Sequence, residues 1–441
     1  MLNFLFTKTP LSFLTQSFWR DEAFSYFMAK KNIIEIILLT AKDFNPPLYY
    51  LILHFWMRVF GSSEIALRSL SLVFFWGTIY VAFLFLNDVF KMKQKKAYFY
   101  LILFIINPLL LYYAFEARMY SMLAFLASLS FYAFYKKNYR LYLLATIGGL
   151  FTHYFMIFVV AGQYLFLLIN RKKGFQFKKS TIYLSGLVFS PWLLLFLSQK
   201  NLFGSFWIAK PQIKYIFGLP GIIYAGIESF IAIDLILLKK IQNNLFFLSL
   251  VLLLILITGI YFYVKKLDKK DRLIFQILFI WAVGIPIFVG AISFIKPIFL
   301  VRYLAFSSVG LILLTIFILE KINGLTRTIL LIILFVLTIN HNQSQLIYGK
   351  KPNSEKTLRE IKTIMNKNDS VYVTSELDYF TAEYYVNDNQ VFIYGKNYGD
   401  IPAYVGKVLI PEEKLAFILP FYPQKAFILN PDGQYTIQAM Y

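Results

Sequence analysis

The sequence predicts a polytopic α-helical membrane protein with a small α/β domain at its C-terminal end. The chain of 441 residues is 59% hydrophobic and has a mean hydropathy of +0.62, whereas soluble domains contain about 45–50% apolar residues. Several uninterrupted apolar runs reach the roughly 20 residues that are needed to cross a bilayer. A more polar segment with strand-like runs follows the last of them.

Basic residues cluster in the connectors between these apolar runs. The formal net charge is +21, which in a soluble protein would suggest a nucleic-acid partner. Here the clusters lie in four short connectors, at 91–96, 136–140, 171–179 and 265–272. Loops of this composition are retained in the cytoplasm, so we expect no nucleic-acid partner. The chain has no cysteine, which excludes disulfides and thiolate metal sites.

Residues 1–63 are predicted to form an N-terminal segment and a first external loop. Apolar residues at helical spacing within 23–42 predict a helix that lies in the membrane interface. Pro46-Pro47 ends that helix, and Pro47 is expected in the first turn of a second helix over 48–60, which Gly61 ends. Nothing in the first 20 residues would carry Met1 across a membrane, so we expect that one preceding span is missing from this sequence.

About ten spans are predicted within 64–345. If the Lys-rich connectors lie inside, then residues 1–63, the corner at 116–118, the stretch 199–243 and the residues after 341 lie outside. The run 222–238 is apolar enough to cross, but a crossing there would move the basic connector 265–272 outside. We therefore expect 199–243 to be an external loop with an interfacial or re-entrant helix. The predicted spans are 64–90, 97–113, 119–135, 140–153, 155–170, 180–198, 244–264, 273–295, 299–319 and 326–340.

Residues 350–441 are predicted to form a small extracytoplasmic α/β domain. Apolar positions at helical spacing predict a helix over 355–366. Four strand-like runs follow it. They cover 370–374, 390–394, 414–419 and 425–429.

The acidic pair Asp21-Glu22 opens an ordered set of motifs. It is followed by the Pro46-Pro47 turn, by Arg68 after Ala-Leu, by a corner at 116–120 and by a late turn at 301–304. Over about residues 20–340 this set resembles the GT-C membrane glycosyltransferases. It is most similar to the protein O-mannosyltransferase and aminoarabinose-transferase type, glycosyltransferase family 39.

The resemblance implies an enzyme of the inner or plasma membrane. It would transfer a sugar, with inversion, from a polyprenyl-phosphate donor to an extracytoplasmic lipid, glycan or protein. Asp21 would be the general base, because an attacking hydroxyl must lose its proton to a positioned carboxylate. Arg302, together with Arg68 or Arg118, would hold the phosphate of the leaving lipid, since guanidinium forks suit phosphate oxygens.

Several further residues are expected to support this site. They are Glu116, Tyr120, Asp43, Asn45, Tyr303 and Lys210. A divalent metal held by Glu22, Asp43 and His54 stays open, as does a similar role for His153. The family often has a charged or histidine residue where Asn45 stands, so this turn departs from the pattern.

Structural roles compete with each of these functional ones. Asp21 could cap the following helix, and Glu22 could orient Asp21 or favour the helix N-terminus. Asp43 and Asn45 could form an Asx-turn. Arg68 could extend to lipid head groups.

Three other functions stay open beside glycosyl transfer from a lipid phosphate. A transporter or flippase of lipid-linked sugars would place charges deep within its spans, whereas here they lie at the outer ends. A non-catalytic assembly subunit would not need Asp21. A transferase that uses lipid-diphosphate oligosaccharides would differ in its donor.

Overall fold

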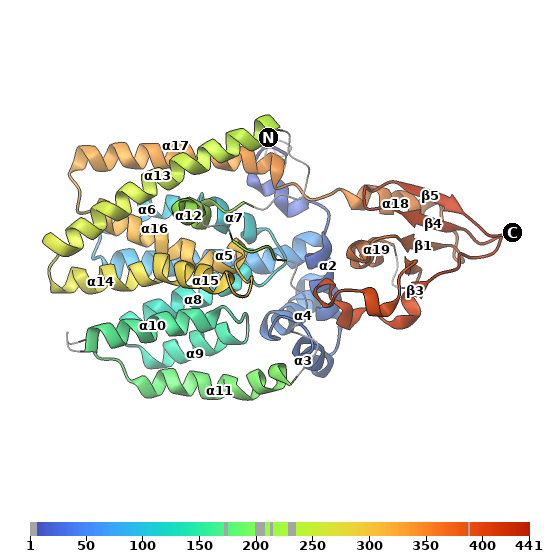
Figure 1. Cartoon of the computed structure of the whole chain (residues 1–441), viewed down its shortest axis with the longest axis horizontal. Coiled ribbons are helices and arrows are strands. Elements are labelled where there is room, and N and C mark those ends of the chain that lie inside the picture. The colour runs from blue at the N-terminus through green and yellow to red at the C-terminus, as the bar shows by residue number, and fades with distance from the viewer. Residues whose placement is uncertain (1–6, 172–174, 199–207, 212–214, 228–234, 387–388) are drawn as a thin grey trace.

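The computed structural model shows a helical bundle with a small mixed α/β domain at one end (Figure 1). It describes residues 7–171, 175–198, 208–211, 215–227, 235–386 and 389–441. The helices of the bundle run mainly along the long axis of the molecule. Three short helices, α2, α3 and α4, lie between the bundle and the C-terminal domain (Figure 1).

The bundle is built from the helices that the apolar runs predict. α16 has all of its residues buried, as expected for a helix that is apolar on every side. The bounds are α5 Glu64–Leu84 continued by a π turn Phe85–Val89, α6 Gln94–Ile105, α7 Pro108–Ala114, α8 Tyr120–Tyr135, α9 Tyr139–Leu150, α10 Met156–Asn170, α11 Lys179–Leu197, α12 Tyr215–Ala225, α13 Leu235–Lys265, α14 Lys269–Phe279, a π turn Ile280–Gly284, α15 Ile285–Ser293, a 3-10 turn η6 Val301–Leu304, α16 Ala305–Leu319 and α17 Gly324–Tyr348.

Every predicted span coincides with helix, but their lengths differ. Among the described residues, six helical stretches are long and apolar enough to cross a membrane, or seven if α6 and α7, bent by 72°, form one span. α8, α9 and α10 have 16, 12 and 15 residues, short of the roughly 20 that a straight crossing needs. The chain therefore has the architecture of a multi-pass membrane protein, while the count of ten stays a prediction.

The stretch 199–243, which was predicted to be an external loop, ends within α13, and its place outside the membrane stays a prediction. α13 begins at Leu235 and continues without a break through the predicted span 244–264. Of the expected interfacial helix over 222–238, the structure describes only the end of α12 and the start of α13. Residues 199–207, 212–214 and 228–234 lie outside the described residues.

The single helix predicted over 23–42 is two helices, α2 Arg20–Lys30 and α3 Ile33–Ala41. Asn32 separates them, because its side chain accepts from the Glu35 N–H while the Glu35 carboxylate accepts from the Asn32 N–H. This reciprocal capping box satisfies the first free N–H groups of a new helix. Four apolar side chains of α3 are exposed, which suits a membrane interface. They are Ile33, Ile34, Ile37 and Leu38.

α4 covers Leu48–Phe60 and ends at Gly61, as predicted. Gly61 has φ +83°, a left-handed conformation that glycine adopts without a steric penalty. Pro47 is the N-cap residue of α4 and does not lie in its first turn. The observed bounds of this helix are therefore those predicted, and only the position of Pro47 relative to its first turn differs.

The C-terminal domain holds a five-stranded sheet in the order β3-β2-β1-β4-β5. The strands are β1 Ser370–Val373, β2 Val391–Tyr394, β3 Leu415–Ala416, β4 Ala426–Leu429 and β5 Tyr435–Gln438. All neighbours pair in parallel except β4 and β5, which are antiparallel. Helices α18 Ser354–Ile364 and α19 Tyr379–Tyr385 complete the domain. The helix and the first four strands were predicted, whereas α19 and β5 were not.

Candidate active site

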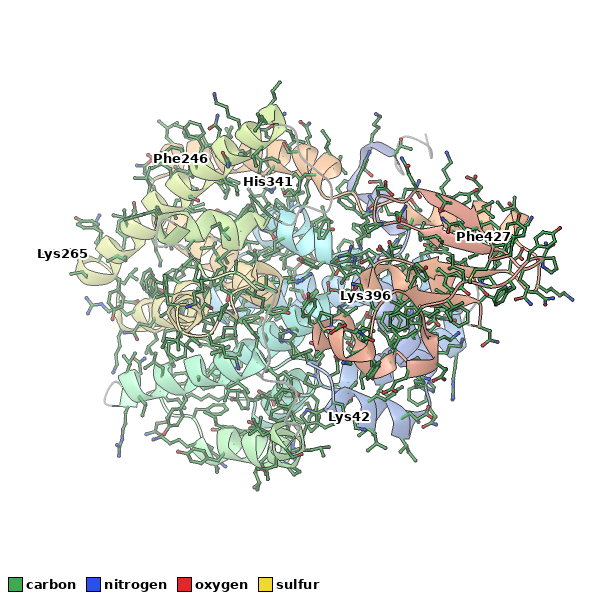
Figure 2. All side chains as sticks on the ribbon, turned by 45° about the vertical axis from the view of Figure 1, so that its right-hand side comes forward. Lys42, Phe246, Lys265, His341, Lys396 and Phe427 are labelled. Atoms are coloured by element: carbon green, nitrogen blue, oxygen red, sulfur yellow. The ribbon has the colours of Figure 1, made fainter. Side chains whose placement is uncertain are left out.

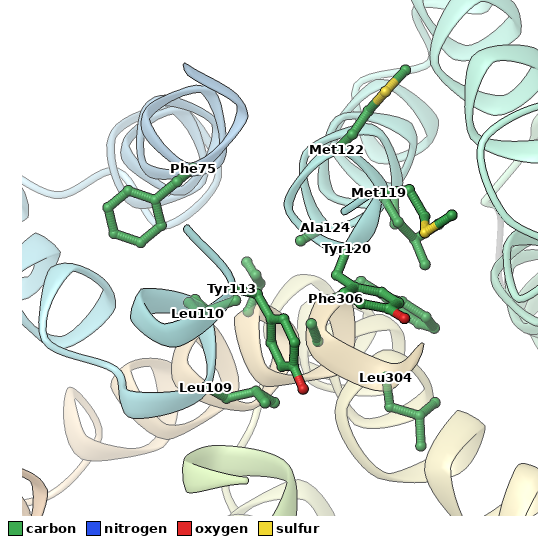
Figure 3. Packing of buried hydrophobic residues seen from close by; sticks show 14 of the residues in the cluster. Phe75, Leu109, Leu110, Tyr113, Met119, Tyr120, Met122, Ala124, Leu304 and Phe306 are labelled. Atoms are coloured by element: carbon green, nitrogen blue, oxygen red, sulfur yellow. The ribbon is translucent and has the colours of Figure 1, made fainter. Parts of the chain in front are cut away.

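Residues that are far apart in the sequence meet where the bundle faces α2. Buried hydrophobic side chains of α5, α7, α8 and α16 belong to one core cluster in this part of the bundle (Figure 3). The rings of Tyr113 and Tyr120 contact each other edge to face, with their centroids 5.0 Å apart. This packed floor fixes the corner at 115–119, which carries two of the predicted site residues.

Glu22 lies at the centre of a buried ion cluster. Its side chain is fully buried and accepts from Arg68 Nε at 2.8 Å and from Arg68 Nη2 at 2.7 Å. Lys351 Nζ donates to it at 2.8 Å, and the Ala117 N–H donates at 2.9 Å. Burial disfavours the charge of this carboxyl, but Arg68 and Lys351 together lower the pKa of Glu22 to about 2. Glu22 is therefore an ionised carboxylate that joins three parts of the chain.

Arg68 is buried against the turn that precedes α2. Besides Glu22, its guanidinium donates to the Leu14, Gln16 and Ser17 carbonyl oxygens, at 2.5 to 3.1 Å. All five N–H groups of an arginine are thereby used. Arg68 stands on α5 and is wholly buried, so it does not extend to lipid head groups. It fixes the position of the segment that leads into α2.

Asp21, next to Glu22, has a different environment. It lies in the first turn of α2, whose N-cap is Trp19 without a side-chain cap, so Asp21 does not cap this helix. Its side chain is 33% exposed, and its carboxylate lies 3.7 Å from Arg302 Nη1. Ser25 Oγ donates to its backbone carbonyl at 2.9 Å and Arg118 Nη1 does so at 3.3 Å. The backbone of Asp21 is thus fixed while its carboxylate stays open to solvent.

Arg302 comes from η6, at the start of the central helix α16. It is 5% exposed, and its guanidinium lies 5.9 Å from the ring centroids of both Tyr120 and Tyr303. His153 packs on Tyr303 with 4.8 Å between ring centroids. These rings bury the guanidinium beside Asp21, and a buried charge acts more strongly than one in bulk solvent.

Arg118 binds the other side of the α2 start. Besides the Asp21 carbonyl, its Nη1 lies 3.3 Å from Ser25 Oγ and 3.4 Å from the Tyr50 hydroxyl oxygen. Its guanidinium also lies 5.9 Å from the ring centroid of Tyr120. The cluster therefore has two arginines within reach of one residue, Asp21.

Two other acids near Asp21 are buried and disfavour their charged forms. Burial raises the pKa of Glu116 to about 7, against the opposing charges of Lys351, 3.6 Å away, and Arg302. Among the residues that the structure describes, neither of its carboxylate oxygens has a hydrogen-bond partner. Burial also raises the pKa of Asp43 to about 6, although the Phe44 backbone and the Asn45 side chain donate to it. At neutral pH these two acids hold protons more readily than ordinary carboxylates do.

The residues named for a metal do not come together as a ligand set. His54 Nδ1 lies 2.7 Å from the Ala29 carbonyl oxygen, near the C-terminal end of α2, whereas Glu22 lies in the first turn of that helix. The Glu22 carboxylate is surrounded by N–H donors. In the part of the chain that the structure describes, no three His, Asp or Glu side chains are grouped to hold a metal ion. These residues therefore do not fit a bound divalent cation.

The described contacts do not bring Lys210 to the cluster either. It is exposed within 208–211, between segments outside the described residues. Sequence reasoning missed Lys351, whose ammonium group is buried between two carboxylates. It also missed Ser71, whose hydroxyl donates to the Glu116 carbonyl at 2.5 Å. Lys351 is the second of two adjacent lysines that follow the last predicted span. From the sequence, it could not be distinguished from a lysine that lies at the membrane interface.

The arrangement can take a proton and hold an anion at one place. Asp21 presents a partly exposed carboxylate, and Arg302 presents a guanidinium 3.7 Å from it. A carboxylate can accept a proton from a hydroxyl group, and a guanidinium can bind phosphate oxygens.

The fold resembles that of solved GT-C structures. ArnT from Cupriavidus metallidurans, an aminoarabinose transferase, in the apo state superposes with a TM-score of 0.61 at 12% identity, covering 95% of this chain and 89% of that one. The same protein bound to undecaprenyl phosphate gives 0.60 at 12% identity, covering 98% and 93%. No protein-family model and no curated protein matches the chain. The predicted GT-C fold is confirmed.

Proposed function

We propose that this chain is a membrane glycosyltransferase that moves a sugar from a polyprenyl-phosphate donor to an acceptor hydroxyl or amine group, with Asp21 as the general base. The observation that carries the proposal is the pairing of one accessible carboxylate with one arginine at the end of the bundle. The ArnT-like fold, with undecaprenyl phosphate bound to one of the similar structures, supports a lipid-phosphate donor.

Asp21 is chosen over its neighbours because of its accessibility. Its side chain is 33% exposed, whereas Glu22 and Glu116 are 0% and 1% exposed. Glu22 is also saturated by Arg68, Lys351 and a backbone N–H. Only an acid that an acceptor can reach can take its proton, so Glu22 is assigned the role of orienting the start of α2.

Arg302 is chosen to hold the donor phosphate. Arg68 has all of its N–H groups engaged by Glu22 and the preceding turn, and Arg118 is turned to the backbone of α2. Arg302 lies beside the accessible Asp21 carboxylate. The sugar of the bound donor would lie at this place, between the acceptor and the lipid phosphate. Its positive charge would stabilise the second negative charge that develops on the leaving lipid phosphate.

The reaction inverts the anomeric carbon in this proposal. The acceptor atom attacks that carbon as the bond to the phosphate oxygen breaks, Asp21 takes the acceptor proton, and the lipid phosphate leaves with the bond electrons. A single displacement needs one base and no covalent sugar-enzyme intermediate, which matches one accessible carboxylate. We place this site on the extracytoplasmic side of the inner or plasma membrane, because the basic connectors mark the other side as cytoplasmic.

The test is sugar transfer in membranes that contain the wild type or Asp21→Asn, supplied with labelled polyprenyl-phosphate sugars. Asparagine keeps the shape of the side chain but cannot take a proton, so we expect transfer to fall by roughly 10²–10⁴-fold. Asp400→Asn, at an exposed position of the C-terminal domain, is the matched control and should transfer at the wild-type rate.

Each rival function predicts a different result. Undiminished transfer by Asp21→Asn would sink the assignment of the base. Movement of the labelled lipid across the membrane without transfer would indicate a transporter or flippase. Transfer only from lipid-diphosphate sugars would indicate the other donor class, and a wild type inactive with every donor would fit a non-catalytic subunit.

A further inference from the structure

The C-terminal domain is fixed to the helix that carries Asp21. Ser17 Oγ donates to the Pro352 carbonyl at 2.7 Å, and the Lys351 N–H donates to Gln16 Oε1 at 3.0 Å. The Phe18 N–H donates to the Tyr385 hydroxyl at 2.7 Å. Figure 1 shows α19 of this domain close to α2, at the end of the bundle. The turn before α2 is thus held from the bundle side by Arg68 and from the domain side by these contacts.

Further contacts extend this junction to α5. The Tyr385 hydroxyl donates to Glu64 at 2.9 Å, and the Tyr384 hydroxyl donates to the Ser62 carbonyl at 2.9 Å. Arg20, in the first turn of α2, lies 3.7 Å from Asp378 of the C-terminal domain. The domain therefore contacts both helices whose side chains form the Glu22–Arg68 pair.

One charged side chain of the linker enters the cluster itself. Lys351 lies just after α17, and its side chain is 3% exposed. Its Nζ lies 2.8 Å from Glu22 and 3.6 Å from Glu116. Burying an ammonium group costs several kcal/mol unless it is paired, and a lysine that only linked two domains would not need to be buried. This residue is placed where two acids require a positive charge.

We infer that Lys351 is a positioning residue of the active site, so that the C-terminal domain and its linker form part of the site. This inference rests on the proposed transfer reaction. Lys351 bridges Glu22, which is next to Asp21 on α2, and Glu116, which stands on the corner that also carries Arg118. It thereby fixes the spacing between the base and the arginines. It does not touch the reacting atoms.

A charge effect accompanies this positional effect. Four charged groups act on Glu116, namely Lys351, Glu22, Arg302 and Asp21, and Glu22 is acted on by Arg68 and Lys351. Lys351 is the cation that favours the ionised form of both acids. Without it, burial and their mutual repulsion would make both acids take up protons at a higher pH.

The test compares Lys351→Met with Lys350→Met in the full-length protein in membranes. Methionine keeps the length of the stem and removes the charge, and Lys350 is the exposed neighbour in the same linker. We expect Lys351→Met to lower kcat by roughly 10–100-fold with little change in donor KM, since a small displacement of a catalytic group has effects of this size. Lys350→Met should behave like the wild type.

The pH dependence of the transfer rate distinguishes the loss of the Lys351 charge from a general loss of folding. The acidic limb of the transfer rate should move to higher pH in Lys351→Met and stay in place in Lys351→Arg, which keeps the positive charge. An unmoved acidic limb in Lys351→Met, an equal loss in Lys350→Met, or a loss confined to KM would overturn the inference. If Lys351→Met does not accumulate, the double variant Glu116→Gln with Lys351→Met removes one buried charge of each sign and should show the same loss of kcat.

A second measurement does not depend on activity. Hydrogen exchange over residues 16–30 should be faster in Lys351→Met than in Lys350→Met, because the turn before α2 loses one of its anchors. A wild type that transfers no sugar would refute the proposed function while this exchange result still tested the anchoring. Equal exchange in the two variants would refute the anchoring whatever the activity.

Discussion

The two ends of the helical bundle differ in how far their paired charged side chains are buried. At the α2 end three charged side chains of the cluster are buried, with exposed fractions of 0% for Glu22 and Arg68 and 3% for Lys351. At the other end Lys96 and Lys321 are 42% and 36% exposed while they pair with Glu320 and Asp271. Figure 2 likewise shows Lys265, the first residue of the 265–272 connector, at the margin of the molecule away from the C-terminal domain.

The difference separates two uses of charge in a membrane protein. Exposed pairs gain little in free energy because water screens them, so the exposed charges at the basic end do not depend on complete partners. Buried charges are costly and persist only when their partners are complete. The α2 end is therefore where a single substitution should have large effects, and four predictions test this contrast from the largest effect to the smallest.

Arg68→Met should have the largest effect on stability. It leaves Glu22 with Lys351 as its one cationic partner and frees three carbonyl oxygens, and breaking a buried pair from one side costs about 3–5 kcal/mol. Thermal unfolding in detergent measures this loss. Arg327→Met at the other end is the control, because Arg327 is 28% exposed. Equal losses in the two variants would remove the contrast between the ends.

Arg302→Ala should lower transfer more than it lowers stability. Removing a donor that stabilises developing charge costs about 10²-fold in rate. The ion pair of Arg302 with Asp21 is long, at 3.7 Å, and Asp21 is partly exposed, so losing this pair should cost less stability than losing the buried Glu22–Arg68 pair. Arg302→Lys keeps the charge without the fork and should lose less. Labelled-donor kinetics measure both variants, and a normal rate in Arg302→Ala would mean that another group holds the phosphate.

Glu116 should make stability depend on pH. Burial raises the pKa of this carboxyl from 4.5 to about 7, so between these values the folded state holds a proton that the unfolded chain has lost. Stability then decreases as pH rises through this window and stays lower above it. Glu116→Gln removes the dependence, and its Tm relative to the wild type should be higher at pH 8 than at pH 5. We expect about 2–3 kcal/mol between pH 5 and pH 8, as this interval includes about two units of the pKa shift and one unit corresponds to about 1.4 kcal/mol. A Tm difference that is the same at both pH values would refute this assignment.

Lys321→Ala should have the smallest effect. Lys321 pairs with Asp271 at the surface, and such pairs contribute about 0–1 kcal/mol. Thermal unfolding and transfer should both stay close to those of the wild type. A loss as large as that of Arg68→Met would show that the basic end is also a structural centre.

The sequence by itself determined the membrane class, the helical positions and the GT-C resemblance. Hydrophobic runs are local, and their length and periodicity report helices without knowledge of their neighbours. The same local logic predicted the end of α4 at Gly61 and four of the five strands. It failed where a local signal was outweighed, as at Asn32, whose capping box divides one apolar stretch into two helices.

Only the tertiary structure decided which of the two adjacent acids is accessible. Asp21 and Glu22 are adjacent acids, and no local pattern distinguishes their exposure. In the fold, Asp21 faces solvent and Arg302, whereas Glu22 faces Arg68 and Lys351. Lys351 lies 329 residues from Glu22 in the chain, and no spacing rule connects them. The environment of a side chain depends on which distant segments pack around it, and that packing is a property of the whole fold.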